Sequence, residues 1–421
     1  MKYHNKLMLL FFIIWGVVGL ERMVLGFVLP AITEEFKMNL TQAGMVVAAF
    51  SFAYAIGTSA LGGLSSSGIF GRRPLLVLWL VLGGLFSWLT GMVTGFVSLL
   101  LIRIIMGFAH GGIYPCCAPT LLEESPENVR GRNLGLLTTG MFIFGAVIGP
   151  ILSSQLLVTI GWRPVFFLYA IPAFVLAIIT WFVMRETPST EAMMKARKIG
   201  KTKVKALDAE GREISYWSIF KYRNVILMGL FWVCQLAWIW MITSFGVLYI
   251  MNFHGMKITQ VGLLMSGFGI GAALGAVVFG AVSDRIGRKT TLIFTQLAAL
   301  VVGSVFVTMG AGTPLIVLFL LLLLWAMLVI GAAAAASTIP AETVGFSMAG
   351  AAMGFAAGLG ELIGGGIIPI IGGRLGDIFG LRATMWLTVA LVGVSVIIAL
   401  FVKDTKPLTV QTDKSSPPVM Q

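Results

Sequence analysis

The chain has 421 residues, of which 58% are hydrophobic and only 11% are charged. An average soluble domain carries about 25% charged residues, so this composition excludes a water-soluble globular enzyme. A helix that crosses a bilayer needs about 20 apolar residues, and the roughly 244 hydrophobic positions therefore suffice for about twelve such helices. Basic loops at the anionic membrane leaflet explain the net charge of +12, and we expect no nucleic-acid partner.

Twelve apolar stretches, bounded by charged residues, Pro or Gly clusters, are predicted to span the lipid bilayer. They cover residues 8–31, 43–64, 74–94, 96–118, 134–156, 164–184, 225–250, 260–281, 290–309, 314–338, 347–371 and 382–402. We expect the first stretch to remain in the protein, because Glu21 and Arg22 stand where a cleaved signal would end in small residues. The three cysteines lie in apolar runs without metal-like or disulfide-like spacing, so we expect free thiols and no metal site.

The longest polar stretch separates the sixth and seventh spans. With both termini in the cytoplasm, 22 Lys or Arg residues face the cytoplasm and 5 face the other side. Because cytoplasmic loops carry an excess of basic residues, this distribution predicts cytoplasmic termini in a plasma membrane. The predicted parts are a helical bundle over 1–184, a cytoplasmic linker over 185–224, a second bundle over 225–402 and a cytoplasmic tail over 403–421.

The two halves are sequence repeats of each other. TQAG at 41–44 recurs as TQVG at 259–262, an offset of 218 residues. Four more residues recur at an offset of 219: Glu123 and Glu342, Gly131 and Gly350, Pro150 and Pro369, Gly161 and Gly380. Parallel repeats of this kind form transporters whose central site opens to each side in turn. We therefore predict an all-α polytopic membrane protein with twelve transmembrane helices in two six-helix repeat bundles.

The loop after the eighth span carries a family signature. Its sequence GAVSDRIGRK, residues 280–289, matches the pattern G-x-x-x-D-R-x-G-R-K of the major facilitator superfamily, which the chain resembles over nearly its whole length. The resemblance implies the major facilitator fold, a monomer, and a cytoplasmic latch that uses this loop. The gating residues expected here are Asp284, Arg285, Arg288 and Lys289. A simple positive anchor at the membrane surface is the alternative interpretation.

The corresponding loop of the first half reads GGLSSSGIFGRR, residues 62–73. It has two extra residues and carries Ser66 where the signature has Asp. Only Arg72 and Arg73 are left as gating candidates in this half.

Five ionisable residues lie inside the predicted spans: Glu21, Arg22, Arg103, His110 and Glu361. A charge at the centre of a bilayer costs about 2.5 kcal/mol or more, so each of them is a candidate for the transport site. Four of the five belong to the first half. The repeat offsets place Trp240, Leu322 and Val329 opposite Arg22, Arg103 and His110, and Phe142 opposite Glu361.

The fourth span places Arg103, Gly107, His110 and Tyr114 on one helical stripe. Arg103 with Gly107 resembles the R-x-x-x-G signature of proton-linked members of the superfamily. We therefore predict that Arg103 and Tyr114 contact the substrate and that His110 takes part in proton coupling. The alternatives are an arginine that ties helix ends together and a histidine that only packs.

The first span reads LERMVLGFVLPAITEEF, residues 20–36, and resembles the anion:cation symporter branch, which includes sialin, the vesicular glutamate carriers and bacterial sugar-acid importers. The resemblance implies that Glu21 binds a proton and that Arg22 binds the anion. Tyr54 matches a tyrosine in the second span of the same branch. That branch usually has an acid where this chain has His110, whose imidazole ordinarily titrates near pH 6.5.

Three residues of the second half complete the candidates. Glu361, within GLGELIGGG, is predicted to be either a second proton site or a hydrogen-bonding group in a bent glycine-rich helix. Gln235 and Trp238 are predicted to line the cavity from the seventh span, although aromatic helix packing is the more common role for such residues.

These residues predict proton-coupled symport of a small organic anion, with the proton gradient as energy source and no cofactor. A carboxylate cannot stay unpaired in a cavity of low dielectric, and an arginine offers a planar donor fork that fits it. An anion that competes for Arg22 would favour proton uptake by Glu21, unless the two residues form a permanent ion pair. GAVIGP, residues 145–150, resembles part of the signature of drug:H⁺ antiporters, so proton-coupled export is the alternative function. The chain has no Walker A loop and no hydrolase motif, so it is expected to be neither a pump nor an enzyme.

Overall fold

A computed structural model describes residues 2–198, 216–344 and 348–405 of the chain. In these ranges the backbone forms helices and no strand. Twelve helical segments are long and apolar enough to cross a membrane, which confirms the predicted number of spans. The chain is therefore an integral membrane protein built entirely from helices in its described part.

The first half contains six spans. Four of them are single helices: α1 (Tyr3–Glu35), α2 (Leu40–Ser65), α3 (Arg72–Thr90) and α8 (Trp162–Val183). The fourth span is divided into α4 (Phe96–Gly111) and α5 (Ile113–Glu124), and the fifth into α6 (Arg130–Gly140), the π-helix η2 (Met141–Ile148) and α7 (Gly149–Ile160). A short 3₁₀ turn, η1 (Glu127–Val129), connects these two spans.

The second half also contains six spans, and two of them are divided. Its single-helix spans are α12 (Ile258–Ile286), α13 (Arg288–Thr308), α14 (Leu315–Val344) and α17 (Leu381–Phe401). The seventh span consists of α10 (Arg223–Met241), the π-helix η4 (Ile242–Gly246) and α11 (Val247–His254). The eleventh consists of α15 (Ala349–Leu359), the π-helix η5 (Gly360–Gly365) and α16 (Ile368–Phe379). Several helices extend beyond the predicted apolar stretches, as α1 does at both of its ends.

The predicted linker is helical at both of its described ends. Helix α9 (Pro188–Lys198) follows the first half, and the 3₁₀ turn η3 (Tyr216–Lys221) precedes the second. Arg197 Nη1 on α9 donates to the Ser67 carbonyl oxygen at 3.1 Å, which joins α9 to the loop after α2. Residues 199–215 of the predicted linker and 406–421 of the predicted tail lie outside the described residues.

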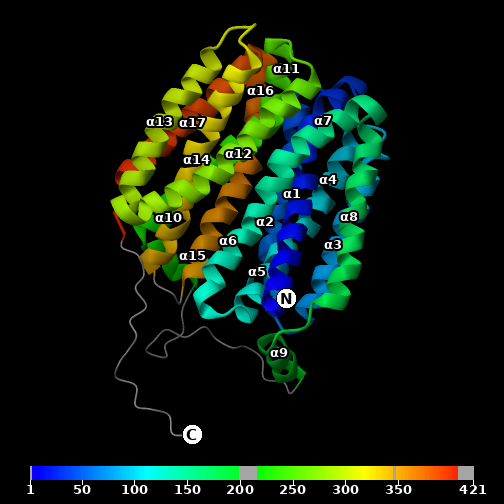
Figure 1. Ribbon diagram of the computed structural model, residues 1–421, viewed down its shortest axis with the longest axis vertical. Coiled ribbons are helices and arrows are strands. Elements are labelled where there is room, and N and C mark those ends of the chain that lie inside the picture. Colours follow the sequence, from blue (N-terminus) through cyan, green and yellow to red (C-terminus); the bar gives the residue numbers. More distant parts are fainter. Residues whose placement is uncertain (1, 199–215, 345–347, 406–421) are drawn as a thin grey trace.

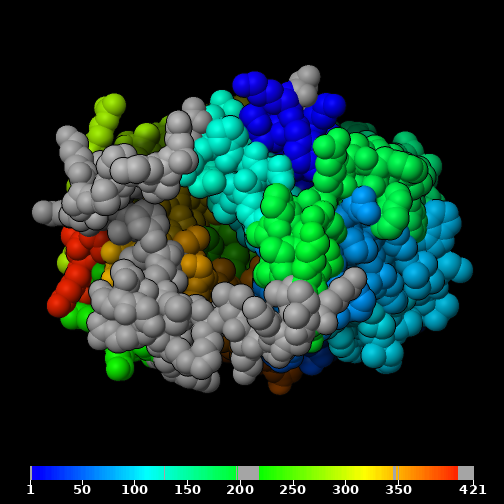
Figure 2. Space-filling view, turned by 90° about the horizontal axis from the view of Figure 1, so that it is seen from below, coloured from blue at the N-terminus to red at the C-terminus, as the bar shows by residue number. Residues whose placement is uncertain are grey.

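Figure 1 shows the two halves side by side, with α1–α8 in blue to green and α10–α17 in green to red. We call the end of the molecule where α1 begins the terminal face, because α17 also ends there and α9 lies beyond it, and we call the opposite end the far face. Figure 2 views the terminal face, and a hollow lies between α6 and the orange helix α15.

The halves pack most tightly toward the far face, where glycines let the backbones approach. A Cβ atom on Gly26 of α1 would overlap the Thr243 carbonyl oxygen of η4, and one on Gly44 of α2 would overlap the Pro369 carbonyl oxygen of α16. Gly262 of α12 lies equally close to α7. Small residues permit such close helix packing in lipid. The molecule is therefore closed at the far face and hollowed at the terminal face.

Two turns show that the repeat extends to backbone geometry. Gly161, which separates α7 from α8, has φ +79°, and its repeat partner Gly380, which separates α16 from α17, has φ +83°. A side chain would strain the backbone in this conformation, so glycine fits both turns. The π-helices η2 and η5 also begin at repeat-related residues, Met141 and Gly360.

Candidate transport site

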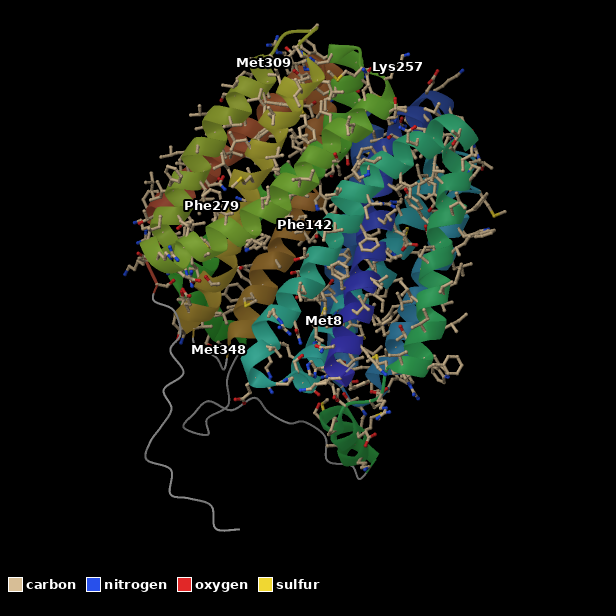
Figure 3. All side chains as sticks on the ribbon, viewed as in Figure 1. Met8, Phe142, Lys257, Phe279, Met309 and Met348 are labelled. Carbon is tan, nitrogen blue, oxygen red and sulfur yellow. The ribbon has the colours of Figure 1, made fainter. Side chains whose placement is uncertain are left out.

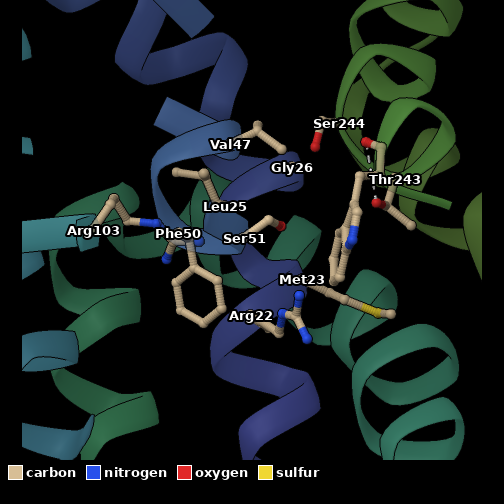
Figure 4. Close-up of a pocket in the computed structure, with 11 residues that line it drawn as sticks. Arg22, Met23, Leu25, Gly26, Val47, Phe50, Ser51, Arg103, Thr243 and Ser244 are labelled. Atoms are coloured by element: carbon tan, nitrogen blue, oxygen red, sulfur yellow. Dashed lines mark hydrogen bonds between the residues drawn. The ribbon is translucent and has the colours of Figure 1, made fainter. Parts of the chain in front are cut away.

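A small pocket lies where α1, α2 and α4 of the first half meet α10 and η4 of the second. Figure 4 shows that residues of both halves surround it. Its lining consists of Arg22, Met23, Leu25, Gly26, Val47, Phe50, Ser51, Arg103, Trp240, Thr243 and Ser244. Two arginines are the only charged residues in this lining. A pocket with this charge, between the two repeats, has the chemistry of an anion site.

Arg22 is bound to the other half of the molecule. Its Nη2 atom donates to both carboxylate oxygens of Glu361, at 2.8 and 2.9 Å. Its guanidinium carbon lies 4.1 Å from the ring centroid of Trp240 and 4.3 Å from that of Tyr54. Only 5% of Arg22 is exposed. Sequence adjacency had suggested Glu21 as the partner of Arg22, but consecutive residues of a helix do not face each other.

Glu361 reaches Arg22 from the π-helix η5. π-Helices are rare, occur mostly as short bulges inside α-helices, and are frequent at functional sites. The repeat-related π-helix η2 carries Phe142 at the position of Glu361, and Figure 3 shows Phe142 where the two halves meet. Each repeat thus has a π-helix at this level, but only the second uses it to present a carboxylate.

Glu21 and His110 form a second buried pair, within the first half. His110 Nε2 lies 3.1 Å from Glu21 Oε2, and the side chains are 0% and 2% exposed. The edge of the His110 ring faces Phe50, with ring centroids 5.4 Å apart. Glu21 Oε1 has no hydrogen-bond partner in the described part of the chain. This pair joins α1 to α4, and neither residue lines the pocket.

Arg103 is a buried cation without a carboxylate partner among the described residues. It is 2% exposed, and its guanidinium carbon lies 4.5 Å from the ring centroid of Phe50. Its one hydrogen bond is a weak contact from Nη1 to Met106 Sδ at 3.7 Å. Arg22 repels it and Glu21 attracts it at longer range. Because a buried cation needs an anion, Arg103 is the group in the pocket with free binding capacity.

The predicted gating loop of the second half forms a compact charged cluster. Arg288 donates from Nη2 to Glu342 Oε1 at 3.0 Å, and it also pairs with Asp284. Asp404 caps the start of α13 by accepting from the Lys289 backbone N–H at 3.2 Å. Arg285 is exposed and takes no part in these bonds.

An equivalent cluster exists in the first half, although the signature Asp is missing there. Arg72 Nη1 donates to Glu123 Oε1 at 2.7 Å, and Glu123 is the repeat partner of Glu342. Glu186 accepts from the backbone N–H groups of Arg72 and Arg73, at 3.0 and 2.9 Å. Glu123 and Glu186 therefore supply the carboxylates that the loop itself lacks.

The sequence model of the family described as the Major Facilitator Superfamily matches residues 11–360 and 237–419 of this chain. The chain belongs to the major facilitator superfamily. Solved structures with low sequence identity to this chain confirm its fold. A bacterial homologue of the human lysosomal transporter Spinster, in an inward-facing and unoccupied conformation, aligns with a TM-score of 0.80 at 17% identity, over 95% of this chain and 96% of that chain. The nucleoside transporter NupG aligns with a TM-score of 0.71 at 15% identity, over 95% and 99%.

Proteins with similar sequences include three bacterial transporters. A hexuronate transporter of Bacillus subtilis (strain 168) is 26% identical, over 70% of this chain and 68% of the relative. A probable 4-methylmuconolactone transporter of Cupriavidus pinatubonensis is 25% identical, over 85% and 81%. The 4-hydroxybenzoate transporter PcaK of Pseudomonas aeruginosa is 25% identical, over 76% and 75%. This superfamily chain is therefore a transporter and not an enzyme.

The remaining predicted site residues do not line the pocket. Tyr54 contacts Arg22 but does not line the pocket. Tyr114 packs against Trp15, with ring centroids 5.0 Å apart. Trp238 packs against Phe268 and Trp325, and Gln235 is 1% exposed with its Oε1 unbonded. These three make no contribution to the pocket wall.

Sequence reasoning missed the groups that line the pocket beside the arginines. Trp240 could have been found, because the repeat offset places it opposite Arg22, and the structure stacks the two side chains together. Ser51, Thr243 and Ser244 gave no signal, because hydroxyl side chains are common in packed membrane helices.

Proposed function

We propose that this protein carries a small organic anion bearing a carboxylate across the plasma membrane together with protons, by alternating access. One observation carries the proposal: Arg22 and Arg103, both buried, face the same pocket between the two halves. A guanidinium group stays protonated in proteins and presents a planar fork that binds carboxylate through two hydrogen bonds. Arg103 has no carboxylate of its own, so a substrate carboxylate completes its pairing.

The charge of the buried cluster supports coupling to protons. Two arginines and two glutamates balance each other when His110 is neutral, so the empty cluster has no net charge. An arriving carboxylate adds one negative charge to a site from which water is largely excluded. Uptake of a proton by an acid or imidazole of the cluster restores neutrality, which lowers the cost of holding the anion. Anion and proton are therefore expected to bind together.

The direction of opening follows from the predicted topology. With both termini in the cytoplasm, the hollowed terminal face is cytoplasmic and the closed far face is external. The structure then corresponds to an inward-facing conformation, in which a monomer releases its substrate into the cell. The two charged clusters around Arg72 and Arg288 lie at this cytoplasmic face, where they are suited to hold the halves during closure.

The relatives support an organic acid as the substrate class. Their names include a hexuronate transporter, a 4-hydroxybenzoate transporter and a cis,cis-muconate transport protein. Each of these names specifies a carboxylate-bearing molecule, which matches a pocket whose only charged groups are arginines.

Uptake into proteoliposomes tests the proposal. We would measure accumulation of radiolabelled glucuronate, 4-hydroxybenzoate and cis,cis-muconate with an acidic exterior and a neutral interior. At least one acid is expected to accumulate above its external concentration, and a protonophore is expected to abolish the accumulation. Arg103→Ala should strongly reduce the accumulation, because the anion binds more weakly, whereas Arg132→Ala, which removes an exposed arginine of the same half, should leave it unchanged. Failure to transport any acid, or transport that ignores the proton gradient, would contradict the proposal.

A further inference from the structure

We infer that Glu361 occupies the place of the substrate carboxylate on Arg22 while the site is empty, and that the anion displaces it and thereby makes Glu361 the proton carrier. This inference rests on the proposed function. It assigns the coupling to one of the three titratable groups of the cluster, Glu21, His110 and Glu361.

The pair already holds a carboxylate on Arg22. Both Glu361 oxygens accept from the Nη2 atom of Arg22, at 2.8 and 2.9 Å, while the Nε atom of Arg22 has no hydrogen-bond partner among the described residues. Arg22 lines the pocket, and Glu361 contacts it from outside that lining. The guanidinium carbon of Arg22 also lies over the rings of Trp240 and Tyr54, so Arg22 has contacts besides Glu361 that hold it at the pocket. Arg22 is thus able to exchange one carboxylate for another.

The two buried glutamates differ in whether they lose their ion-pair partner when the anion binds. The partner of Glu21 is His110, which stays on α4 and does not line the pocket. The partner of Glu361 is Arg22, which is one of the two cations that the anion reaches. Binding of an anion therefore leaves the Glu21 pair intact and removes the partner of Glu361.

No other described cation is within ion-pair distance to replace Arg22. Helix α2 contributes Tyr54, whose hydroxyl lies in the field of both Arg22 and Glu361. Helix α10 carries Arg223 at its start and the buried thiol Cys234, neither of which bonds to Glu361. Helix α15 has no ionisable side chain, and Arg374 and Asp377 stand at the far end of α16. A displaced Glu361 would remain charged and unpaired unless it took up a proton.

The exchange balances charge at every productive step. The anion replaces the Glu361 carboxylate on Arg22, and a proton from the water on the open side binds a Glu361 oxygen. On release the anion departs, Glu361 loses its proton, and the pair forms again. The empty paired state and the fully loaded state are both neutral, whereas anion alone or proton alone leaves a buried charge. The pair joins the two halves in the empty state. Only the two neutral states are suited to reorientation, because a net buried charge is costly.

Glu361→Gln tests the exchange, because the amide resembles the protonated acid in shape. The probe is whichever of glucuronate, 4-hydroxybenzoate and cis,cis-muconate the unaltered protein transports. In weakly buffered detergent solution, the unaltered protein is expected to take up about one proton per anion bound, and Glu361→Gln none. The variant should bind the anion about tenfold more tightly at alkaline pH, because the internal competitor is gone. It should exchange anion for anion across liposomes but fail to accumulate it.

Three further variants complete the experiment. Glu34→Gln, at an exposed position near the end of α1, controls for a neutralised glutamate elsewhere and should retain proton uptake. Glu361→Asp keeps a carboxylate and should retain proton uptake while it binds the anion more tightly than the unaltered protein. Should Glu361→Gln not fold, as judged by thermal unfolding, an unchanged anion affinity in Glu361→Asp would overturn the inference. Proton uptake that persists in Glu361→Gln and disappears in Glu21→Gln would overturn it too, without affecting the proposed symport.

Discussion

The two halves of this transporter agree at their ends and differ at the centre. At the terminal face, Arg72 pairs with Glu123 and Arg288 pairs with Glu342, at repeat-related positions. At the pocket, the first half supplies both arginines, and the second supplies Trp240 opposite Arg22. The shared parts are those that build and move a bundle, which each half needs. The parts that differ are those that recognise a ligand, and one site between the halves needs them only once.

Glu361 is the exception that connects the two halves. It is the acid of the central cluster that comes from the second half, and it pairs with the first. The asymmetry thus places the cations on one side of the interface and a competing carboxylate on the other. Substitutions in the cluster, in the end clusters and at the far face test this comparison.

Arg22→Ala is expected to have the largest effect. It removes one of the two arginines that bind the anion, and it leaves Glu361 as an unpaired buried carboxylate at a cost of about 3–5 kcal/mol of folding stability. Uptake of the organic acid should be lost, and thermal unfolding of the purified protein should shift to lower temperature. The double variant Arg22→Ala with Glu361→Gln should regain most of the stability and none of the uptake. A double variant as unstable as the single one would show that the pair is not the reason for the loss.

Arg288→Ala and Arg72→Ala compare the end clusters. The Arg288 partner Glu342 has 5% of its side chain exposed, whereas the Arg72 partner Glu123 has 31%. Water can therefore solvate Glu123 after its partner is lost. We expect about 3 kcal/mol of lost stability for Arg288→Ala and about 1 kcal/mol for Arg72→Ala, measured by thermal unfolding. Equal losses would mean that burial of the partner does not distinguish the two clusters.

Arg103→Ala should separate binding from stability. Hydrogen bonds to charged groups contribute about 1.5–3 kcal/mol, so the anion should bind roughly 10- to 100-fold more weakly. Stability should change by less than about 1 kcal/mol, because Arg103 has no carboxylate partner to leave unpaired among the described residues. Titration with the transported acid and thermal unfolding measure the two quantities. Arg103→Lys, which keeps the charge and loses the planar fork, should lie between the two proteins in affinity.

Much of the fold could be predicted because simple physical constraints determine it. Bilayer thickness sets the length of each span, and repeat offsets relate the halves, so the twelve spans and the paired glycine turns at Gly161 and Gly380 were open to prediction. The charged candidates could be found as well, because an ionisable residue in a span is costly unless it has a role.

The pairing of those candidates could not be predicted. Glu21 and Arg22 are neighbours in sequence, but a helix turns about 100° per residue, so they face different elements. Arg22 and Glu361 are 339 residues apart, and no repeat offset relates them. The π-helices η4 and η5 also change the direction in which their side chains point, Glu361 among them. Pairing across the interface depends on tertiary geometry, which the local sequence does not encode.

The far face carries the smallest predicted effect and a further asymmetry. Asp377 of α16 accepts from the backbone N–H groups of Leu40 and Thr41, at 2.8 and 3.0 Å, and so caps α2 across the interface. The repeat offset places Val158 opposite Asp377, and the matching contact of α12 with α7 is made by Gly262 against Pro150 and Ser154. One side of the far face is therefore held by a charged cap and the other by packing alone.

Asp377→Ala should loosen this closure. Loss of a helix cap costs about 1 kcal/mol, which corresponds to a several-fold shift toward a state that is open at the far face. Spin labels on cysteines introduced at the exposed positions Lys37 and Lys257 would report this opening as a population at longer distance. Asp377→Asn should restore the short distance in part, because its single side-chain oxygen accepts one of the two N–H bonds that the two oxygens of Asp377 accept. If the Ala and Asn variants open equally, the negative charge rather than the cap holds α2 to α16, and the helix dipole is then the physical reason for the closure.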